Sequence, residues 1–434
     1  TPVTSRSRMP SSAWKKKNVT KAIEKKFKLY GFDEILTPTV EYTGIFTLKS
    51  GEEITESMFA FKDKGNRDVC LKPEQTVSTA RFFIENFKNF AMPLKFYYFC
   101  PVFRYDEPQH ARYREFWHLG VELIGSNTPE SDAEVISLAY CGLKQLNLNF
   151  ELELSNIKVI KGVLNSTNLS RGDKEKILHY IDKHNDEGIN EILKRTDNGE
   201  ILNKVLSFKG KRGNLNELKN IVRNCPEAIE GIEELENILN FVEMFNNDYV
   251  INFNIVRGLD YYTSNVFEIH ANDMQICGGG RYDNLIGLFS DKDSKNDKNK
   301  GVPAVGFAYG FDRVIEALKA QNLIPKFENN KILITYVSEE FLPYCIKVAG
   351  ELRERNITAD LDIMKRKVKK AMEYANNKYR YVIVVGKKEF EEGRITLRDM
   401  ESGGQKFLDV GEIEPLCWIY SMNRANLISK IWSW

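Results

Sequence analysis

The first 42 positions of the chain show two different spacings of apolar residues. From about Val19 to Tyr30, apolar residues recur every three or four positions, which predicts an amphipathic helix that ends at Gly31. Residues 32–42 then have the pattern of an extended strand, and this strand contains Pro38. This stretch therefore predicts a helix followed by a strand.

Two apolar, aromatic-rich runs between Leu94 and Gly125 flank the polar stretch 105–114, as in an antiparallel hairpin with a long loop. If residues 115–124 form a strand, its period of two separates two sets of side chains. One face would carry Phe116, His118, Gly120, Glu122 and Ile124, and the other Glu115, Trp117, Leu119, Val121 and Leu123. The second face is apolar enough for a core, so the first would be the floor of a polar cleft; a solvated face explains the pattern equally well.

The middle of the chain changes from strand to helix and back. Residues 151–159 predict a strand, and residues 164–244 have helical periodicity with many Lys, Glu and Asn residues. Strand character returns at 250–269 and 274–277, before the glycine run 278–280. We therefore interpret the helical stretch as an insertion into a single domain.

After a predicted helix from about Val305 to Lys319, short strands alternate with helices, which predicts a separate α/β domain. The predicted division of the chain is residues 1–160 and 249–325 as two parts of one domain, 161–248 as the helical insertion, and 326–434 as the α/β domain.

The composition indicates the class of protein but says little about its activity. The 434 residues are 42% hydrophobic and 28% charged, and no run of about 18 apolar residues appears, so we expect a soluble globular protein. The seven cysteines are scattered without a C-x-x-C pair, and residues 1–17 are polar and basic, which favours a cytoplasmic protein without a cysteine zinc site. With a formal net charge of +1, any contact with RNA must come from a local basic patch.

Several arginines converge on the predicted hairpin. Arg104 ends its first strand, and Arg112 and Arg114 lie in its loop. Guanidinium groups suit phosphate oxygens because they donate in a planar, bidentate geometry and stay charged. Ion pairs with neighbouring carboxylates explain each of these arginines equally well.

Two glycine-containing stretches could also approach a ligand. Gly306, Gly310 and Arg313 share a face of the predicted helix at 305–319, where a flat ligand could reach the backbone, although helix packing uses small residues in the same way. Residues 257–262 place a cation, a glycine and two tyrosines after a strand-like run, and buried structural tyrosines are the alternative there.

Taken in chain order, these segments resemble the motifs of one protein family. Residues 257–263 (R-G-L-D-Y-Y-T) and 278–283 (G-G-G-R-Y-D) are similar to two motifs of the histidyl-tRNA synthetases. The chain also resembles the three class II synthetase motifs, at residues 31–41, 103–122 and 304–313. Residues 71–76 (L-K-P-E-Q-T) resemble the family segment that binds the amino acid's ammonium group.

The resemblance implies an α+β fold with a class II antiparallel sheet flanked by helices, a helical insertion and a C-terminal α/β anticodon-binding domain. It also implies a histidine–tRNA ligase. Such an enzyme uses ATP, with Mg²⁺, to form histidyl-adenylate and pyrophosphate, and then transfers histidine to the 3′ end of tRNA(His). A homodimer that binds L-histidine and tRNA(His) is implied as well.

The same resemblance assigns roles to individual residues. ATP would be bound by Arg104, Asp106, Arg112, Phe116 and Arg313. Histidine would be bound by Glu74, Gln75, Thr76, Arg104, His118, Glu122, Arg257, Tyr261 and Tyr262. Arg104 and Arg257 would be the catalytic residues: Arg104 would bind the α-phosphate and the histidine carboxylate, and Arg257 would neutralise charge as that carboxylate attacks the α-phosphate. A tRNA-contacting patch would comprise Lys365, Arg366, Lys367, Lys369 and Lys370, for which a solvated helix face is the alternative.

The sequence departs from the family pattern at three positions. His118 stands where glutamine is usual, Asp106 where glutamate is usual, and Ser264 where glycine is common. An imidazole cannot reproduce the geometry of a carboxamide, so His118 would contact the substrate's amino end differently from the family's glutamine.

Two other interpretations fit parts of the pattern. The synthetase-like regulatory subunit of ATP phosphoribosyltransferase binds histidine without making an adenylate, but it typically lacks the anticodon domain and the catalytic arginine. Here Arg257 and residues 331–434 are both present. Synthetases of the same subclass for glycine, threonine or proline share the class II motifs, but the R-G-L-D-Y-Y stretch with Glu122 favours histidine.

Overall fold

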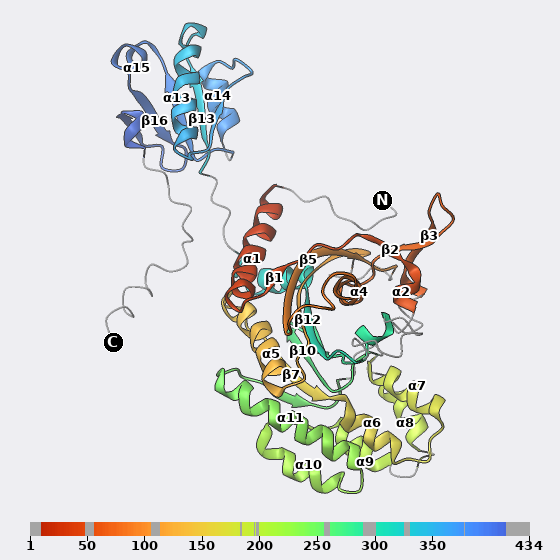
Figure 1. Cartoon of the computed structure of the whole chain (residues 1–434). Coiled ribbons are helices and arrows are strands. Elements are labelled where there is room, and N and C mark those ends of the chain that lie inside the picture. The colour runs from red at the N-terminus through yellow and green to blue at the C-terminus, as the bar shows by residue number, and fades with distance from the viewer. Residues whose placement is uncertain are drawn as a thin grey trace. The chain divides into compact units, whose positions relative to one another are not determined.

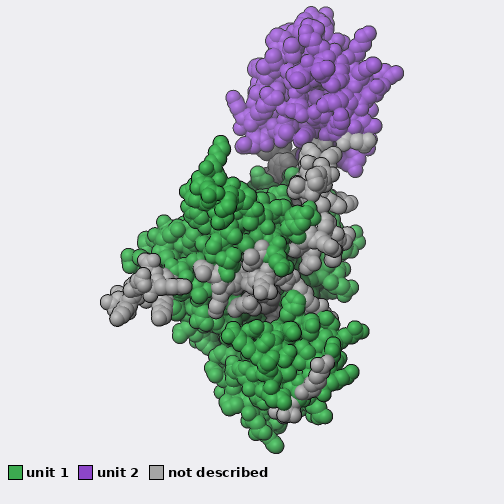
Figure 2. Space-filling view, turned by 90° about the vertical axis from the view of Figure 1, so that its right-hand side faces the viewer, with its two compact units in different colours: residues 1–325 green, residues 326–434 purple. Residues whose placement is uncertain are grey.

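The structure, a computed structural model, describes residues 10–47, 56–105, 113–182, 185–194, 196, 199–255, 261–289, 301–324, 330–376 and 378–413. The chain divides into two compact units, Thr1–Pro325 and Lys326–Trp434 (Figure 2). Among the described residues, no helix is both long enough and apolar enough to cross a membrane.

The first unit is built on a nine-stranded sheet (Figure 1). Its strands, in spatial order, are β1 (Asp33–Glu34), β5 (Leu94–Phe103), β6 (Glu115–Ile124), β12 (Ala304–Gly310), β11 (Met274–Arg281), β10 (Asn265–Ala271), β7 (Glu151–Asn156), β9 (Val250–Asn252) and β8 (Lys209–Gly210). Neighbouring strands are antiparallel except for the pairs β1–β5 and β7–β9, which are parallel. The predicted antiparallel sheet is therefore confirmed.

The side chains of the β5–β6 hairpin lie on the two faces of the sheet as the alternation predicts. Its ten paired residues run from Leu94 opposite Ile124 to Phe103 opposite Glu115. On one face Leu119, Val121 and Leu123 are buried in a core with helices α1 (Pro10–Leu29) and α5 (Pro129–Lys144), which lie along that face in Figure 1. The opposite face, toward α4 (Thr76–Asn86), carries Phe116, His118 and Glu122 of β6.

Three predicted element boundaries are wrong. The first helix begins at Pro10 rather than Val19, because lysines, which are good helix formers, extend it beyond its apolar stripe. The strand predicted at 32–42 is interrupted around Pro38, which has no amide to donate. Its two ends are β1 and β2 (Val40–Tyr42), and β2 belongs to a separate sheet of order β2-β4-β3, with β4 (Asp68–Leu71) and β3 (Phe59–Lys62). The strand predicted at 151–159 ends at Asn156, whose side chain accepts the amide of Lys158 and begins helix α6.

The helix predicted from Val305 begins only at Phe311, as α12 (Phe311–Ala320). Residues 304–310 form strand β12 instead, because Val305, Phe307 and Tyr309 alternate with small residues and enter the core together. Gly306 and Gly310 therefore share a strand face, with Arg313 in the first turn of the helix that follows.

Residues 164–244 are largely helical, as predicted. The helices are α6 (Ile157–Asn165), α7 (Arg171–Asp182), α8 (Asp186–Leu193), α9 (Gly199–Leu206), α10 (Leu215–Ile221) and α11 (Pro226–Met244), with a 3₁₀ turn η1 (Arg212–Asn214) and strand β8. Helices α6 and α11 pack closely, since a Cβ at Gly162 would overlap the backbone of Ala228. The remaining short elements of this unit are α2 (Thr43–Thr47) and η2 (Ile286–Phe289).

The second unit contains a five-stranded sheet of its own. The strand order is β14 (Ala359–Leu361), β13 (Ile332–Tyr336), β15 (Tyr381–Val385), β16 (Ile395–Asp399) and β17 (Gln405–Leu408). The first three strands are parallel and the last two pair antiparallel. Helices α13 (Leu342–Glu354), α14 (Val368–Ala375) and α15 (Lys387–Glu392) and the 3₁₀ turns η3 (Glu339–Phe341) and η4 (Val410–Glu412) complete it.

Candidate functional site

A cleft of about 190 Å³ lies over the polar face of the nine-stranded sheet. Its walls come from the beginning of α4, the strands β6, β11 and β12, and the first turn of α12. The lining residues are Glu74, Thr76, Arg104, Tyr113, Phe116, His118, Tyr261, Tyr262, Gln275, Ile276, Cys277, Gly278, Tyr282, Gly306, Phe307, Ala308, Gly310, Asp312 and Arg313. Eight of the proposed ATP and histidine ligands are therefore brought together here: Glu74, Thr76, Arg104, Phe116, His118, Tyr261, Tyr262 and Arg313.

Glu122 lies directly beneath this cleft, with 1% of its surface exposed. Its neighbour on β12 is Gly306, and a Cβ at that position would overlap the Glu122 carboxylate. Three hydroxyls donate to the carboxylate: Thr76 at 2.8 Å and Tyr98 at 3.0 Å to Oε1, and Tyr282 to Oε2. Because Gly306 has no side chain, the Glu122 carboxylate stays within reach of a small ligand. The three hydroxyls fix the orientation of this carboxylate.

Burial raises the pKa of Glu122 to about 8, although hydrogen bonds from Tyr282, Thr76 and Tyr98 lower it. The same burial, next to an acid, raises the pKa of the Tyr98 and Tyr282 hydroxyls, which therefore remain donors. A carboxyl group that titrates near neutrality at the base of a cleft is typical of a functional site.

The beginning of helix α4 supplies one wall of the cleft. The Glu74 carboxylate is 3% exposed and accepts the backbone amides of Thr76 at 2.7 Å and Val77 at 2.9 Å. The carboxylate thus neutralises the positive end of the helix while it lines the cleft. Gln75 points away, because its amide pairs with Thr37 at 2.9 Å and with Lys72 at 2.8 Å.

Two arginines, Arg104 and Arg313, line the cleft. The Arg104 Nε donates to the carbonyl oxygen of Pro73 at 2.9 Å, and its guanidinium lies 5.6 Å from the centre of the Phe116 ring. Arg313 donates to the carbonyl oxygen of Gln275 at 2.9 Å. Both guanidiniums therefore lie in a cleft that also contains an aromatic ring, and a guanidinium is a planar cation suited to phosphate and carboxylate oxygens.

Aromatic rings fill the remaining side. Tyr261 and Tyr262 are buried with ring centroids 4.9 Å apart, and Tyr261 also contacts the edge of the Tyr282 ring. His118 on β6 lies 5.3 Å from Phe116 in a perpendicular arrangement. The described part of the R-G-L-D-Y-Y stretch thus lies beside Glu122's hydroxyl partners.

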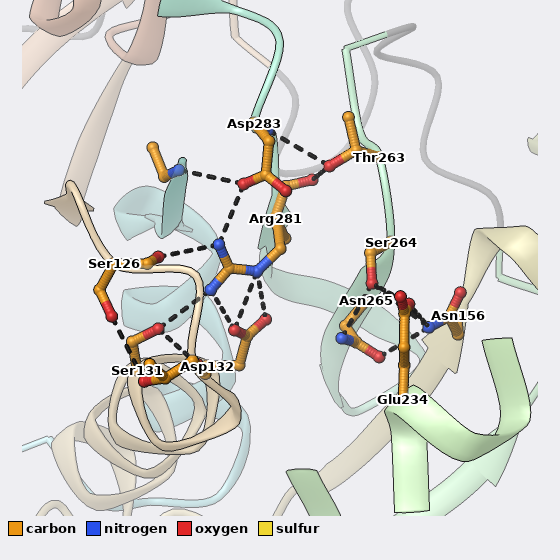
Figure 3. A network of polar contacts seen from close by, with 12 residues as sticks. Ser126, Ser131, Asp132, Asn156, Glu234, Thr263, Ser264, Asn265, Arg281 and Asp283 are labelled. Atoms are coloured by element: carbon orange, nitrogen blue, oxygen red, sulfur yellow. Dashed lines mark hydrogen bonds and ion pairs between the residues drawn. The ribbon is translucent and has the colours of Figure 1, made fainter. Parts of the chain in front are cut away.

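The residue before Tyr282, Arg281, makes several polar contacts (Figure 3). Arg281, with 5% exposure, donates from Nε to Asp132 at 2.9 Å and from its terminal nitrogens to Ser131 and Asp283, each at 3.0 Å. A fourth acceptor is the carbonyl oxygen of Ser126, at 2.9 Å. The end of β11 is therefore fastened to the first turn of α5.

Not all predicted site residues can be placed. Asp106, Arg112 and Arg257 lie outside the described residues. The proposed tRNA-contacting residues lie in the second unit, where Lys365 pairs with Glu339 at 2.9 Å and Arg366 with Asp362 at 2.5 Å. The other members of that patch, Lys367, Lys369 and Lys370, are exposed at the beginning of α14.

Sequence reasoning missed two residues that contact Glu122. Tyr282 stands in the recognised G-G-G-R-Y-D stretch but received no role, and Tyr98 received no attention. The alternation in residues 94–103 could have identified Tyr98, because it pairs with Gly120 two positions before Glu122.

Comparison with known proteins places these features in one family. The family model described as histidyl-tRNA synthetase matches residues 5–314, and a model described as anticodon binding domain matches residues 331–418. The chain belongs to the histidyl-tRNA synthetase family. Among its relatives are proteins named histidine–tRNA ligase from Methanococcus maripaludis strain C6, 42% identical over 93% of this chain and 96% of that one, and from Pyrococcus furiosus, 39% identical over 93% and 95%.

Solved members of the histidyl-tRNA synthetase family share the fold. The histidyl-tRNA synthetase from Nostoc sp. PCC 7120 has a TM-score of 0.77 at 22% identity, over 93% of this chain and 95% of that one. A protein described as an ATP phosphoribosyltransferase regulatory subunit/histidyl-tRNA synthetase, from Bacillus halodurans C, also has a TM-score of 0.77, at 23% identity, over 89% and 98%. The class II synthetase architecture predicted from the motifs is confirmed.

Proposed function

We propose that this cleft activates histidine with ATP and that the chain then transfers histidine to the 3′ end of tRNA(His). The observation that carries the proposal is the buried Glu122 carboxylate, fixed by three hydroxyls beneath the bare backbone of Gly306. A buried polar group of this kind selects a substrate that completes its hydrogen bonds and rejects one that cannot.

Histidine is recognised in this scheme through both ring nitrogens. Glu122 pairs with one nitrogen and the hydroxyl of Tyr262 with the other, because an imidazole offers one donor and one acceptor. Glu74 and Thr76 bind the α-ammonium group, and Tyr261 and His118 complete the wall. Gln75 acts indirectly in this scheme, because its side chain supports the beginning of α4 from outside the cleft.

ATP occupies the end of the cleft with the arginines. Phe116 and Arg313 enclose the adenine ring, and Arg104 binds the α-phosphate and the histidine carboxylate. Arg112 and Asp106 contact the distal part of ATP, and Arg257 neutralises the charge that develops as the carboxylate attacks phosphorus, which expels pyrophosphate. These last three roles rest on the motif resemblance.

Magnesium fits this site only as a companion of the nucleotide. Among the described residues, no group of three or more His, Cys, Asp or Glu side chains could hold a metal ion. Mg²⁺ commonly binds through substrate phosphates with one or two carboxylates, and bound in that way it would offset phosphate charge. The residues of this chain would position histidine and the α-phosphate.

The second unit serves tRNA in this proposal. Its match to the anticodon binding domain at residues 331–418 supports contact with the tRNA anticodon, and the exposed lysines at the beginning of α14 suit phosphates. The same match weighs against a purely regulatory histidine-binding role.

We also propose a homodimer that works in the cytoplasm. Support for the dimer comes from a run of exposed apolar side chains around the first class II motif: Leu29, Leu36, Val40 and Tyr42, which are 69%, 78%, 46% and 52% exposed. A patch of this kind often marks a protein interface.

The test is ATP–pyrophosphate exchange by the purified protein with each of the twenty amino acids in turn. We expect exchange with histidine alone, and its loss in Glu122→Ala while the variant keeps its melting temperature within a few degrees. Exchange with a different amino acid, or undiminished exchange by Glu122→Ala at low histidine, would overturn the assignment.

A further inference from the structure

A polar network joins the helical insertion to the segment that follows the histidine motif (Figure 3); Asn156, Ser264 and Asn265 are buried, and the Glu234 side chain is 32% exposed. The Ser264 hydroxyl donates to Glu234 Oε2 at 2.7 Å, and the Asn156 side-chain amide donates to the same oxygen at 3.1 Å. Asn156 Nδ2 also lies 3.0 Å from Asn265 Oδ1. We call Asn156, Glu234, Ser264 and Asn265 the insertion network. Glu234 belongs to α11, so the insertion contributes directly to it.

Ser264 is two residues from Tyr262, and the backbone between them has little freedom. Thr263 donates its amide to the carbonyl oxygen of Arg281 at 2.8 Å, and the carbonyl oxygen of Ser264 accepts the amide of Ile157 at 2.9 Å. The Tyr262 ring itself lies against Gly280, where a Cβ would come within 2.9 Å of the ring. A shift of Ser264 would therefore displace Tyr262, whose ring is already in close contact with Gly280.

Glu234 is held as a carboxylate by more than this serine. Burial alone would raise its pKa, but hydrogen bonds from Lys158, Ser264 and Asn156 outweigh burial and lower it. Lys158 contacts Glu234 at 2.5 Å and also Glu230, one turn earlier on α11, at 2.7 Å. An ionised acceptor makes a stronger hydrogen bond to the serine hydroxyl than a neutral one would.

The insertion network also lies near the polar partners of Arg281. Asn265 helps to offset the effect of burial on the pKa of Asp132, the carboxylate that pairs with Arg281. Next to Ser264, the hydroxyl of Thr263 accepts the amide of Asp283 at 3.2 Å, and Asp283 is a partner of Arg281. Figure 3 shows both groups of polar side chains.

We propose that Glu234 and Ser264 are positioning residues for histidine activation, through which helix α11 of the insertion sets the place of Tyr262 in the cleft. This rests on the proposed function, because it takes Tyr262 as a ligand of the imidazole ring. The helical insertion is then a determinant of the affinity for histidine and has little effect on the affinity for ATP, because Tyr262 is not among the proposed ATP ligands.

The experiment measures KM for histidine and KM for ATP separately by pyrophosphate exchange, together with the melting temperature, for Ser264→Ala, Glu234→Ala and the double variant. We expect KM for histidine to rise roughly three- to tenfold in each single variant, with KM for ATP little changed. The double variant should be no worse than the more affected single one, since both remove the same hydrogen bond. Glu234→Gln, which keeps an acceptor oxygen, should recover part of the loss.

Glu230→Ala is the matched control. Glu230 lies on the same helix and contacts the same lysine, but it has no contact with Ser264 among its described bonds, so both KM values should stay at the wild-type level. A purely structural role would lower the melting temperature of Glu234→Ala and leave KM for histidine unchanged, or raise both KM values together. Either result would overturn the proposal.

The wild-type protein separates this proposal from the one on which it rests. If the wild type shows no exchange with histidine, the proposed function fails and the positioning role fails with it. If the wild type exchanges normally and the Ser264 and Glu234 variants match it in KM for histidine, only the positioning role fails.

Discussion

The hydroxyl of Tyr282 donates to the carboxylate of Glu122, although 160 positions separate them in the chain. The contact forms because β12 pairs with both β6 and β11, so the G-G-G-R-Y-D stretch at the end of β11 lies one strand away from β6, where Glu122 and Gly306 face each other. Tyr98 approaches the same carboxylate from β5. Strand pairing therefore brings together the residues around Glu122 that we propose to bind histidine. Changes at these residues should affect histidine binding.

The two tyrosines that contact Glu122 should affect histidine more than ATP. In Tyr98→Phe or Tyr282→Phe, the Glu122 carboxyl group loses a hydrogen-bond partner and gains freedom to turn, so KM for histidine should rise about five- to tenfold, the effect of one typical hydrogen bond. Tyr97→Phe is the control, because Tyr97 occupies the opposite face and its hydroxyl donates to Glu34 at 3.0 Å. Equal KM values for histidine in Tyr98→Phe and Tyr97→Phe would contradict this reasoning.

The pH dependence of kcat/KM for histidine should be bell-shaped. Glu122 has a pKa of about 8 in the free protein, and free imidazole titrates near pH 6.5, about the value for an unperturbed histidine. A pair that shares one proton keeps the buried site neutral overall. Histidine binding should therefore weaken above pH 8, where Glu122 has lost its proton, and below about pH 6.5, where both groups carry one.

The fall in kcat/KM above pH 8 is caused by the titration of Glu122. It should disappear in Glu122→Gln, because a glutamine side chain does not titrate. Pyrophosphate exchange measured from pH 5.5 to 9.5 checks both limbs. A value of kcat/KM that keeps rising above pH 8 would mean that the bound pair carries no proton.

Replacing Gly306 should disturb the carboxylate from above. In Gly306→Ala the new methyl group overlaps Glu122, so we expect a loss of about 1 to 3 kcal/mol in stability and a marked rise in KM for histidine. Gly44→Ala is the matched change, because a Cβ at Gly44 in α2 meets nothing within 4 Å. Chemical denaturation and exchange kinetics on both variants would check this, and a Gly306→Ala protein with wild-type KM would show that Glu122 can move without cost.

Removing residues 331–434 should separate the two steps of the reaction. The second unit has hydrophobic clusters of its own, so its loss should leave the core around the nine-stranded sheet intact. The truncated protein should still exchange pyrophosphate with histidine but charge tRNA poorly. Full charging by the truncated protein would remove the proposed anticodon role of the second unit.

Alternation predicted the fold best where one face of a strand is strongly apolar. Leu119, Val121 and Leu123 placed Glu122 on the opposite face correctly, because a shift of one residue would bury the wrong set. The same kind of signal failed at 304–310, where Gly306 and Gly310 fit both a helix spacing of four and a strand spacing of two. Only the partners of β12 in the sheet decide between them.

The site was predicted less completely than the fold. Adjacent residues can face in different directions at the beginning of a helix, and so Gln75 points to Thr37 while Glu74 and Thr76 line the cleft. The contacts of Tyr98 and Tyr282 with Glu122 depend on the register of strands that are distant in sequence, which no local pattern contains.

The bare backbone at Gly306 limits how the amino-acid specificity of such a protein could be redesigned. An engineer who wants room for a larger amino acid usually shortens a side chain, but over Glu122 none remains to shorten. The added volume would have to come from Glu122, Tyr98 and Tyr282, and removing any one of them strands polar atoms of the others away from water. A variant with a new substrate would therefore need these three positions changed together, because a change at one of them leaves the other two without a partner.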